Sequence, residues 1–164
     1  MEGMLLAKFE NFRYTNKRFK QLYDKKQLIL APKFQRRQVW GPKVKSYFLD
    51  SIIRGFSTPK IYLRETVDNK SRILIREVVD GQQRLRAILD FIDGKLVILP
   101  RDNEFYGGTN FKSLPSNVQN DFLYYETSVD LMRARARFSM VGLRTIASGD
   151  FKQNSFQENS WPYQ

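Results

Sequence analysis

The stretch RILIREVVDGQQRLRAILDFIDG, residues 72–94, constrains the fold more than any other part of the chain. Residues 72–79 are rich in branched side chains, which are typical of a β-strand. After Asp-Gly, four apolar residues recur at the i, i+3, i+4, i+7 spacing of an amphipathic helix that Gly94 ends: Leu85, Ile88, Leu89 and Ile92. The chain therefore turns directly from a strand into a helix, and such a turn is a common place for a ligand.

The residues at this turn allow two interpretations. Asp80 is a good N-cap, and Gln83 three residues later completes a pattern that resembles a capping box. A purely capping role is therefore one interpretation. The other is an anion or phosphate site, because the positive end of the helix dipole lies beside Arg84, whose guanidinium recognises phosphate oxygens.

The rest of the chain predicts alternating helices and strands. The expected helices are residues 13–26, 42–54 and a short one opening near Pro115 and Ser116; the expected strands are residues 28–32, 58–65, 72–79, 95–99 and 125–132. Strands 58–65 and 72–79 are separated by a turn-prone connector, which favours a β-hairpin. Residues 100–110 are expected to form a loop.

The amino-acid composition limits the partners and the catalytic groups that this chain can have. A formal net charge of +11 favours polyanionic partners such as nucleic acid or nucleotides. Because the chain has no cysteine and no histidine, it cannot form a thiol nucleophile, a Ser-His-Asp triad or a zinc site with these ligands. Any chemistry depends on Asp, Glu, Lys, Arg and Tyr, or on a magnesium ion held by carboxylates. No signal peptide or membrane span is expected, so the predicted location is cytoplasmic.

Four segments, in this order and spacing, resemble the N-terminal domain of GmrSD-type modification-dependent restriction endonucleases: FQRRQVW, YFLDSIIRG, PKIYLRE and VVDGQQRLRAILDFIDG. The resemblance covers roughly residues 13–132. It implies a small α+β fold, ParB/sulfiredoxin-like, with a small mixed sheet and packed helices. It also implies a nucleotide or phosphate pocket, with GTP or ATP as the candidate nucleotide and Mg²⁺ as a candidate metal, and a role in bacterial or archaeal defence against modified phage DNA.

The resemblance also implies roles for individual residues. Its DGQQR signature falls on Asp80, Gly81, Gln82, Gln83 and Arg84, and its FQR signature on Phe34, Gln35 and Arg36. Gly81 would let a phosphate approach the backbone, and Gln82 and Gln83 would position a water or the ribose. Arg84 would neutralise phosphate charge, with Arg36 as a second phosphate clamp beside Gln35. Asp80 would cap the helix or hold magnesium; Asp80, Gln83 and Arg84 are the candidate catalytic residues.

The chain departs from the family pattern in two ways. Members of the family often carry a nuclease domain of the histidine-metal type, and this chain has no histidine, so DNA cleavage by the chain alone is not expected. After about Leu131 the family pattern is lost. We therefore expect a domain over residues 1–132 and an atypical, poorly ordered tail over 133–164, as in a truncated or frame-shifted gene copy.

Three functional hypotheses remain open. The first is a nucleotide-binding module, with NTP hydrolysis as a candidate activity, that acts on DNA directly or through a separate nuclease. The second is a non-enzymatic, ParB-like DNA-binding module, in which the basic residues of the first helix contact DNA: Lys17, Arg18, Lys20, Lys25 and Lys26. The third is a non-functional remnant. Because a basic helix is commonly a solvated surface, charge alone does not decide among them.

Overall fold

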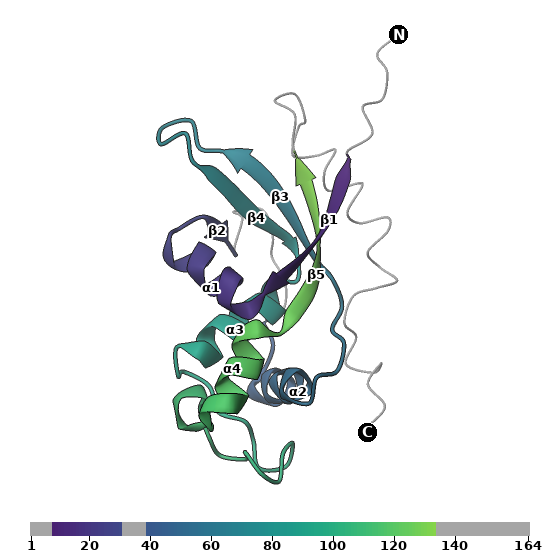
Figure 1. The fold of residues 1–164 in the computed structure, drawn as a ribbon, viewed down its shortest axis with the longest axis vertical. Helices are drawn as coiled ribbons and strands as arrows, with labels where there is room; N and C mark the ends of the chain where they lie inside the picture. The colour runs from purple at the N-terminus through teal and green to yellow at the C-terminus, as the bar shows by residue number, and fades with distance from the viewer. Residues whose placement is uncertain (1–7, 31–38, 134–164) are drawn as a thin grey trace.

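The structure, a computed structural model, describes residues 8–30 and 39–133. These residues form a small α+β fold with a five-stranded mixed sheet, which confirms the predicted fold class (Figure 1). The strands are β1 (Phe9–Thr15), β2 (Leu28–Ile29), β3 (Ile61–Val67), β4 (Leu74–Asp80) and β5 (Glu126–Arg133). The helices are α1 (Asn16–Asp24), α2 (Pro42–Ile53), α3 (Gln82–Ile92) and α4 (Ser116–Tyr124), with the 3-10 helix η1 (Phe111–Ser113) before α4. The tail that we expect to be poorly ordered lies outside the described residues from position 134 onward.

The strands lie in the order β1-β5-β3-β4-β2. Strand β1 runs antiparallel to β5 along its whole length, from the pair Phe9 and Met132 to the pair Thr15 and Glu126. Strand β3 is parallel to β5 and antiparallel to β4, and β2 is parallel to β4. Strand β5, the last of the described strands in sequence, therefore lies between β1 and the hairpin formed by β3 and β4.

Helix α3 connects two hydrophobic clusters. Its residues Leu85 and Leu89 pack with α1 and one face of the sheet. Its residues Ala87, Ile88 and Phe91 pack with apolar side chains of α2, η1 and α4. Figure 1 shows α1 and α3 beside the sheet and α2 and α4 at one end of it. The amphipathic stripe predicted for this helix is thereby confirmed, and the helix positions the corner that precedes it.

Most of the predicted elements are present, with shifted boundaries. The predicted β-hairpin is formed by β3 and β4, the helix from residue 42 is α2, and the helix near Pro115 is α4. The predicted helix over 13–26 is partly wrong, because residues 9–15 form β1 and the helix begins only at Asn16. Thr15 caps it, since its Oγ1 accepts a hydrogen bond from the Arg18 N–H at 3.1 Å.

The predicted strand over 95–99 is wrong. A single isolated bridge joins Val97 to Asn110, and the backbone around it bonds elsewhere. The Leu99 N–H donates to Ser46 Oγ at 2.7 Å, and the Ile98 N–H donates to the Thr109 carbonyl at 3.0 Å. These bonds fold residues 97–110 into a loop that closes on α2 instead of adding a strand to the sheet.

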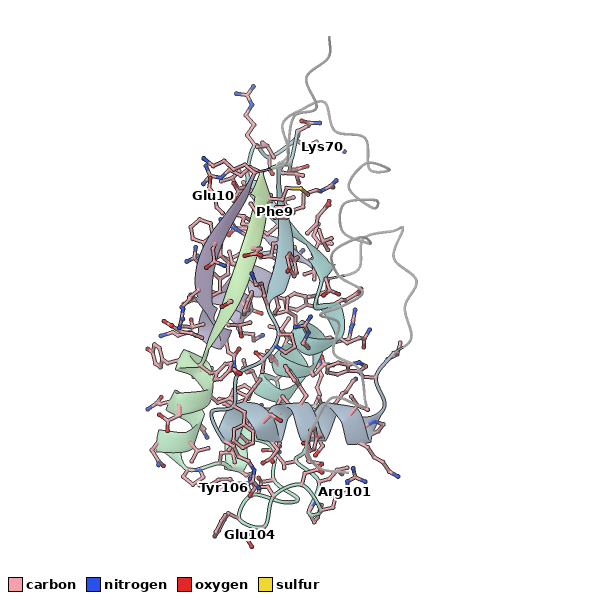
Figure 2. The ribbon with its side chains drawn as sticks, turned by 90° about the vertical axis from the view of Figure 1, so that its right-hand side faces the viewer. Phe9, Glu10, Lys70, Arg101, Glu104 and Tyr106 are labelled. Carbon is pink, nitrogen blue, oxygen red and sulfur yellow. The ribbon has the colours of Figure 1, made fainter. Side chains whose placement is uncertain are left out.

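A buried polar cluster holds this loop against α2. Asp50 accepts hydrogen bonds from Asn103 Nδ2 at 2.6 Å and from Arg54 Nε at 2.7 Å, and Ser46 Oγ donates to Asp102 Oδ2 at 2.5 Å. Figure 2 shows the loop, with Arg101, Glu104 and Tyr106 labelled, at the end of the molecule opposite Phe9 and Lys70. Among the described residues, no helix has the length and apolar character needed to cross a membrane.

Candidate functional site

A single residue separates β4 from α3, and this residue has to be glycine. Gly81 has a φ of +99°, which residues with a Cβ atom rarely adopt. A Cβ atom added there would also lie 2.9 Å from Cγ1 of Ile61, a residue that is 1% exposed. The turn therefore depends on the backbone freedom of Gly81 and on its lack of a side chain.

The predicted capping box at this corner is wrong. The N-cap of α3 is Gly81, and no side chain caps the helix. Asp80 instead accepts a hydrogen bond at Oδ2 from Arg84 Nη2 at 3.2 Å, and Gln83 Oε1 accepts one from the Trp40 N–H at 3.2 Å. Both side chains are bound elsewhere because Arg84 lies one turn along the helix from Asp80, and Trp40 lies beside Gln83. The positive end of the α3 dipole is consequently left without a side-chain oxygen.

Arg84 is buried in the corner, with 4% of its side chain exposed. Its Nη1 donates to the carbonyl of Pro59 at 2.6 Å and to that of Lys60 at 3.0 Å, and its Nη2 contacts Asp80. The guanidinium thus joins the segment before β3, the end of β4 and the first turn of α3. This arrangement makes Arg84 a positioning residue of the corner; its predicted contact with phosphate stays a prediction.

Gln82 and Gln83 form the half-buried part of the first turn. The Oε1 atom of Gln83 is occupied by Trp40, whereas its Nε2 group has no hydrogen-bond partner among residues 8–30 and 39–133. The side-chain amide of Gln82 likewise has no partner in this part of the chain. Two amide donor groups are therefore available beside a helix N-terminus, an arrangement that favours an oxygen-rich, negatively charged ligand.

The second predicted motif lies outside the described residues. Phe34, Gln35 and Arg36 fall within residues 31–38, so their predicted roles stay predictions. The structure does describe Trp40, whose backbone bonds to Gln83 and whose ring meets that of Phe48 edge-on at 5.5 Å. Trp40, which follows shortly after the motif, therefore lies against the first turn of α3.

The carboxylates described near the corner between β4 and α3 are already paired with basic side chains. In the described part of the chain, no three Asp or Glu side chains come together in a group that could hold a metal ion. Asp80, the predicted magnesium ligand, already contacts the Arg84 cation, which disfavours a second cation at the same carboxylate. Nearby, a hydrogen bond from Lys60 Nζ to Asp130 at 3.0 Å raises the pKa of Lys60. The residues that the structure describes do not fit a metal site built by the protein alone.

Replacing Gly81 by Ala is expected to lower the free energy of unfolding by about 1–3 kcal/mol, because the new side chain is strained at φ +99° and meets Ile61. Urea unfolding followed by circular dichroism measures the loss. Gly55→Ala is the matched control: Gly55 has a φ of +76°, but nothing lies within 4 Å of the position of its Cβ atom. A loss at Gly81 no larger than that at Gly55 contradicts the close contact with Ile61.

Three contributors to the site are not predicted from the sequence. They are the backbone N–H of Trp40 and the carbonyls of Pro59 and Lys60. Backbone N–H and carbonyl groups are the same whichever side chain a residue carries, so no sequence motif could have identified these contacts. The sequence does identify the corner itself and all five residues that form it.

Comparison with known proteins adds one match. The model of a protein family described as "GmrSD restriction endonuclease, N-terminal domain" matches residues 19–158. No curated protein and no solved structure matches the chain. The match includes the corner between β4 and α3, the segment before Trp40 and all four described helices except the first residues of α1.

Proposed function

Because the chain belongs to the family of GmrSD restriction endonuclease N-terminal domains, we propose that it binds a nucleoside triphosphate, GTP or ATP, at the corner between β4 and α3. Membership of this family makes the chain a component of a restriction system. In the proposal, the chain is the regulatory module of a modification-dependent system. It acts on DNA together with a separate nuclease, since it lacks the histidine that a histidine-metal nuclease needs.

The first turn of α3 is the observation that carries this proposal. Backbone N–H groups at a helix N-terminus attract phosphate, and no side-chain oxygen caps those of α3. The amide groups of Gln82 and Gln83 add donors at the same end of the helix. Arg84 supports the site by fixing the turn, through its bonds to Asp80 and to the Pro59 and Lys60 carbonyls.

The FQR segment is the proposed second half of the site. Arg36 is four residues before Trp40, so covalent geometry keeps its Cα within about 14 Å of the Trp40 Cα along any path. Trp40 in turn bonds to Gln83 in the first turn of α3. An arginine within this reach can supply the cation that a triphosphate requires, because Arg84 is already bound inside the protein.

Hydrolysis of the bound nucleotide is a further part of the proposal. Gln83 is the residue that we propose to orient the attacking water: its Oε1 is held by Trp40, and this bond also fixes the direction of Nε2 in the same amide. Asp80 keeps Arg84 in place and is not assigned a metal. Mg²⁺ brought in with the nucleotide phosphates stays a prediction, and no step is derived through it.

Arg36→Ala is expected to weaken nucleotide binding by roughly 10- to 100-fold, as for the loss of one charge-assisted hydrogen bond to phosphate. Isothermal titration of the purified chain with GTP and with ATP measures the dissociation constants. Thermal shift gives an independent readout, since a ligand that binds the folded state raises the melting temperature.

Arg37→Ala is the matched control, because it removes the same charge from the next position. Its dissociation constant is expected to stay within about threefold of the wild-type value. Equal weakening by the two variants contradicts a specific phosphate clamp, and the absence of any thermal shift with either nucleotide contradicts the function. Phosphate release by the wild type and by Gln83→Ala tests hydrolysis separately.

A further inference from the structure

Helix α1 and the two residues after it carry four basic side chains that have no acidic partner in the part of the chain that the structure describes. Lys17, Arg18, Lys25 and Lys26 are all exposed, and within residues 8–30 and 39–133 none of them forms an ion pair. Lys20 differs from them: it contacts Asp24 at 2.6 Å and Asp93 at 2.8 Å. These carboxylates raise the pKa of Lys20, chiefly through the hydrogen bond to Asp24, and its charge is neutralised within the protein. Of the five predicted DNA contacts, Lys20 is thus already engaged by the fold.

The acidic residues of the sheet are paired with basic residues of the sheet and its edge, except for Asp80, which is paired with Arg84 of α3, so they do not balance the charge at α1. The pairs within the sheet and its edge are Glu10 with Arg133, Glu65 with Arg76 and Arg133, Glu77 with Arg64, Glu126 with Arg13, and Asp130 with Lys60. The basic residues of the sheet are therefore compensated by neighbouring strands, whereas no carboxylate among the described residues compensates the four at α1. A cluster of uncompensated positive charge consequently lies at α1, where it creates a local field that attracts a polyanion.

The α1 helix is held rigidly, so its charges have fixed positions. Phe19 is 0% exposed, and Asn16 is anchored to the end of α4 and the residue after it: its N–H donates to the Tyr125 carbonyl at 3.1 Å and its Nδ2 to the Phe122 carbonyl at 2.8 Å.

Two basic side chains of α1 also contact aromatic rings. The Lys17 ammonium lies 5.1 Å from the centre of the Tyr124 ring. Arg18 lies over the ring of Tyr14 at 3.9 Å. For Lys17 and Arg18, part of the side-chain freedom is therefore already lost before binding.

Two further lysines extend this charge beyond α1. The contact between Lys20 and Asp93 brings the end of α3 against α1, and the exposed Lys95 follows two residues later. Lys112 packs at the same place, since its Cε lies 3.4 Å from the position of a Cβ atom at Gly94. The four basic residues at α1 together with Lys95 and Lys112 are called the α1 surface below.

We propose that the α1 surface contacts the phosphate backbone of duplex DNA. Lys17 and Lys25 are eight residues apart and thus about 12 Å apart along the helix axis. Over such a length one strand of a duplex, with a phosphate about every 3.4 Å of its axis, presents several phosphates. Lysines and an arginine without acidic partners neutralise phosphates and release counterions, and such contacts position a protein on DNA without reading its sequence. The proposal rests on the proposed function only in that a restriction component acts on DNA; it requires no nucleotide.

The test compares two double variants that each remove two positive charges. Lys17→Gln/Lys25→Gln alters the α1 surface, and Lys8→Gln/Lys43→Gln removes two exposed lysines, one just before β1 and one in α2. Fluorescence anisotropy with a labelled duplex of about 20 base pairs, over a series of salt concentrations and without nucleotide, gives the dissociation constant and its salt dependence.

The α1 variant is expected to bind the duplex about tenfold more weakly near 0.1 M salt, and the slope of log Kd against log salt is expected to fall by about 1.8. The control is expected to stay within about twofold of the wild type. Equal weakening by both variants, unchanged binding by the α1 variant, or binding to anionic lipid vesicles in place of DNA would each overturn the proposal.

Nucleotide titration of the same two variants separates this proposal from the proposed function. Both are expected to bind nucleotide like the wild type, because neither alters the corner between β4 and α3 or Arg36. DNA binding that depends on Lys17 and Lys25 in a chain that binds no nucleotide supports the α1 surface and contradicts the nucleotide site. Nucleotide binding in a chain whose DNA binding is insensitive to these two lysines supports the nucleotide site and contradicts the α1 surface.

Discussion

Replacing Arg84 by Ala is expected to lower the free energy of unfolding by about 3–5 kcal/mol. The side chain is 4% exposed and donates to Asp80 and to the carbonyls of Pro59 and Lys60. Its removal leaves a buried carboxylate without its cation and two carbonyls without their donor. Urea unfolding, analysed with a slope common to wild type and variant, measures this loss.

Two further variants show which part of the guanidinium matters. Arg84→Lys keeps the charge, but one ammonium group cannot reproduce the fork that reaches both sides of the turn, so an intermediate loss is expected. Arg84→Met combined with Asp80→Asn removes both charges and is expected to recover part of the stability. A loss of stability below about 1 kcal/mol for Arg84→Ala contradicts the role of Arg84 in positioning the corner. Because Arg84→Ala disturbs the whole corner, it cannot test nucleotide binding, and Arg36 serves that purpose.

Replacing Phe91 by Ala is expected to cost about 3–5 kcal/mol of stability. Phe91 is 0% exposed, and its ring meets those of Phe111 and Phe122 edge-on, with centroids 5.8 Å and 5.2 Å away. The substitution therefore removes a large buried ring and two favourable aromatic contacts, and leaves a cavity. Thermal and urea unfolding both report the change.

Phe105 provides the matched control for this experiment. It is the same residue type, but it is 79% exposed on the loop that is held against α2. Phe105→Ala is expected to change the free energy of unfolding by less than about 0.5 kcal/mol. Similar losses at Phe91 and Phe105 would show that the second hydrophobic cluster is misassigned.

The elements predicted correctly are those whose signal is local. The apolar stripe of α3, the proline in the first turn of α2 and the two β-rich segments of the hairpin each lie within a dozen or so residues. Their side chains alternate or recur with a period that already matches the face they bury. Local pattern and tertiary structure agree in these elements, so the sequence is sufficient to find them.

The wrongly predicted elements are those whose secondary structure is determined by a partner far away in the sequence. Strand β1 escapes prediction because it is stabilised by β5, and Thr15 pairs with Glu126 far along the chain. Residues 95–99 have the composition of a strand. However, the Leu99 N–H, which a strand would use to pair with its neighbour, donates a hydrogen bond to Ser46 Oγ in α2. Both the pairing of β1 with β5 and the bond from Leu99 to Ser46 join residues far apart in the sequence. Neither can be recognised within the short window of residues from which a strand or helix is predicted.

The site shows the same division. The sequence locates the corner, because Asp-Gly between a strand and a helix marks the turn. It does not identify the partner of Asp80, because Arg84 competes for the carboxylate that a capping box would use. A cap and a salt bridge place Asp at the same position in a sequence, and only the rotamer of the side chain distinguishes them.

The position of β5 between β1 and β3 has a consequence for synthesis of the chain on the ribosome. Strand β1 ends at Thr15, and its partner begins at Glu126, which is 111 residues later. At about 5–20 residues translated per second, β1 waits roughly 6–22 s with an unpaired edge before its neighbour exists. The hairpin and α3 can assemble earlier, because their contacts are short in sequence. The nascent chain therefore has to keep an aromatic strand from pairing with other chains until β5 has been translated.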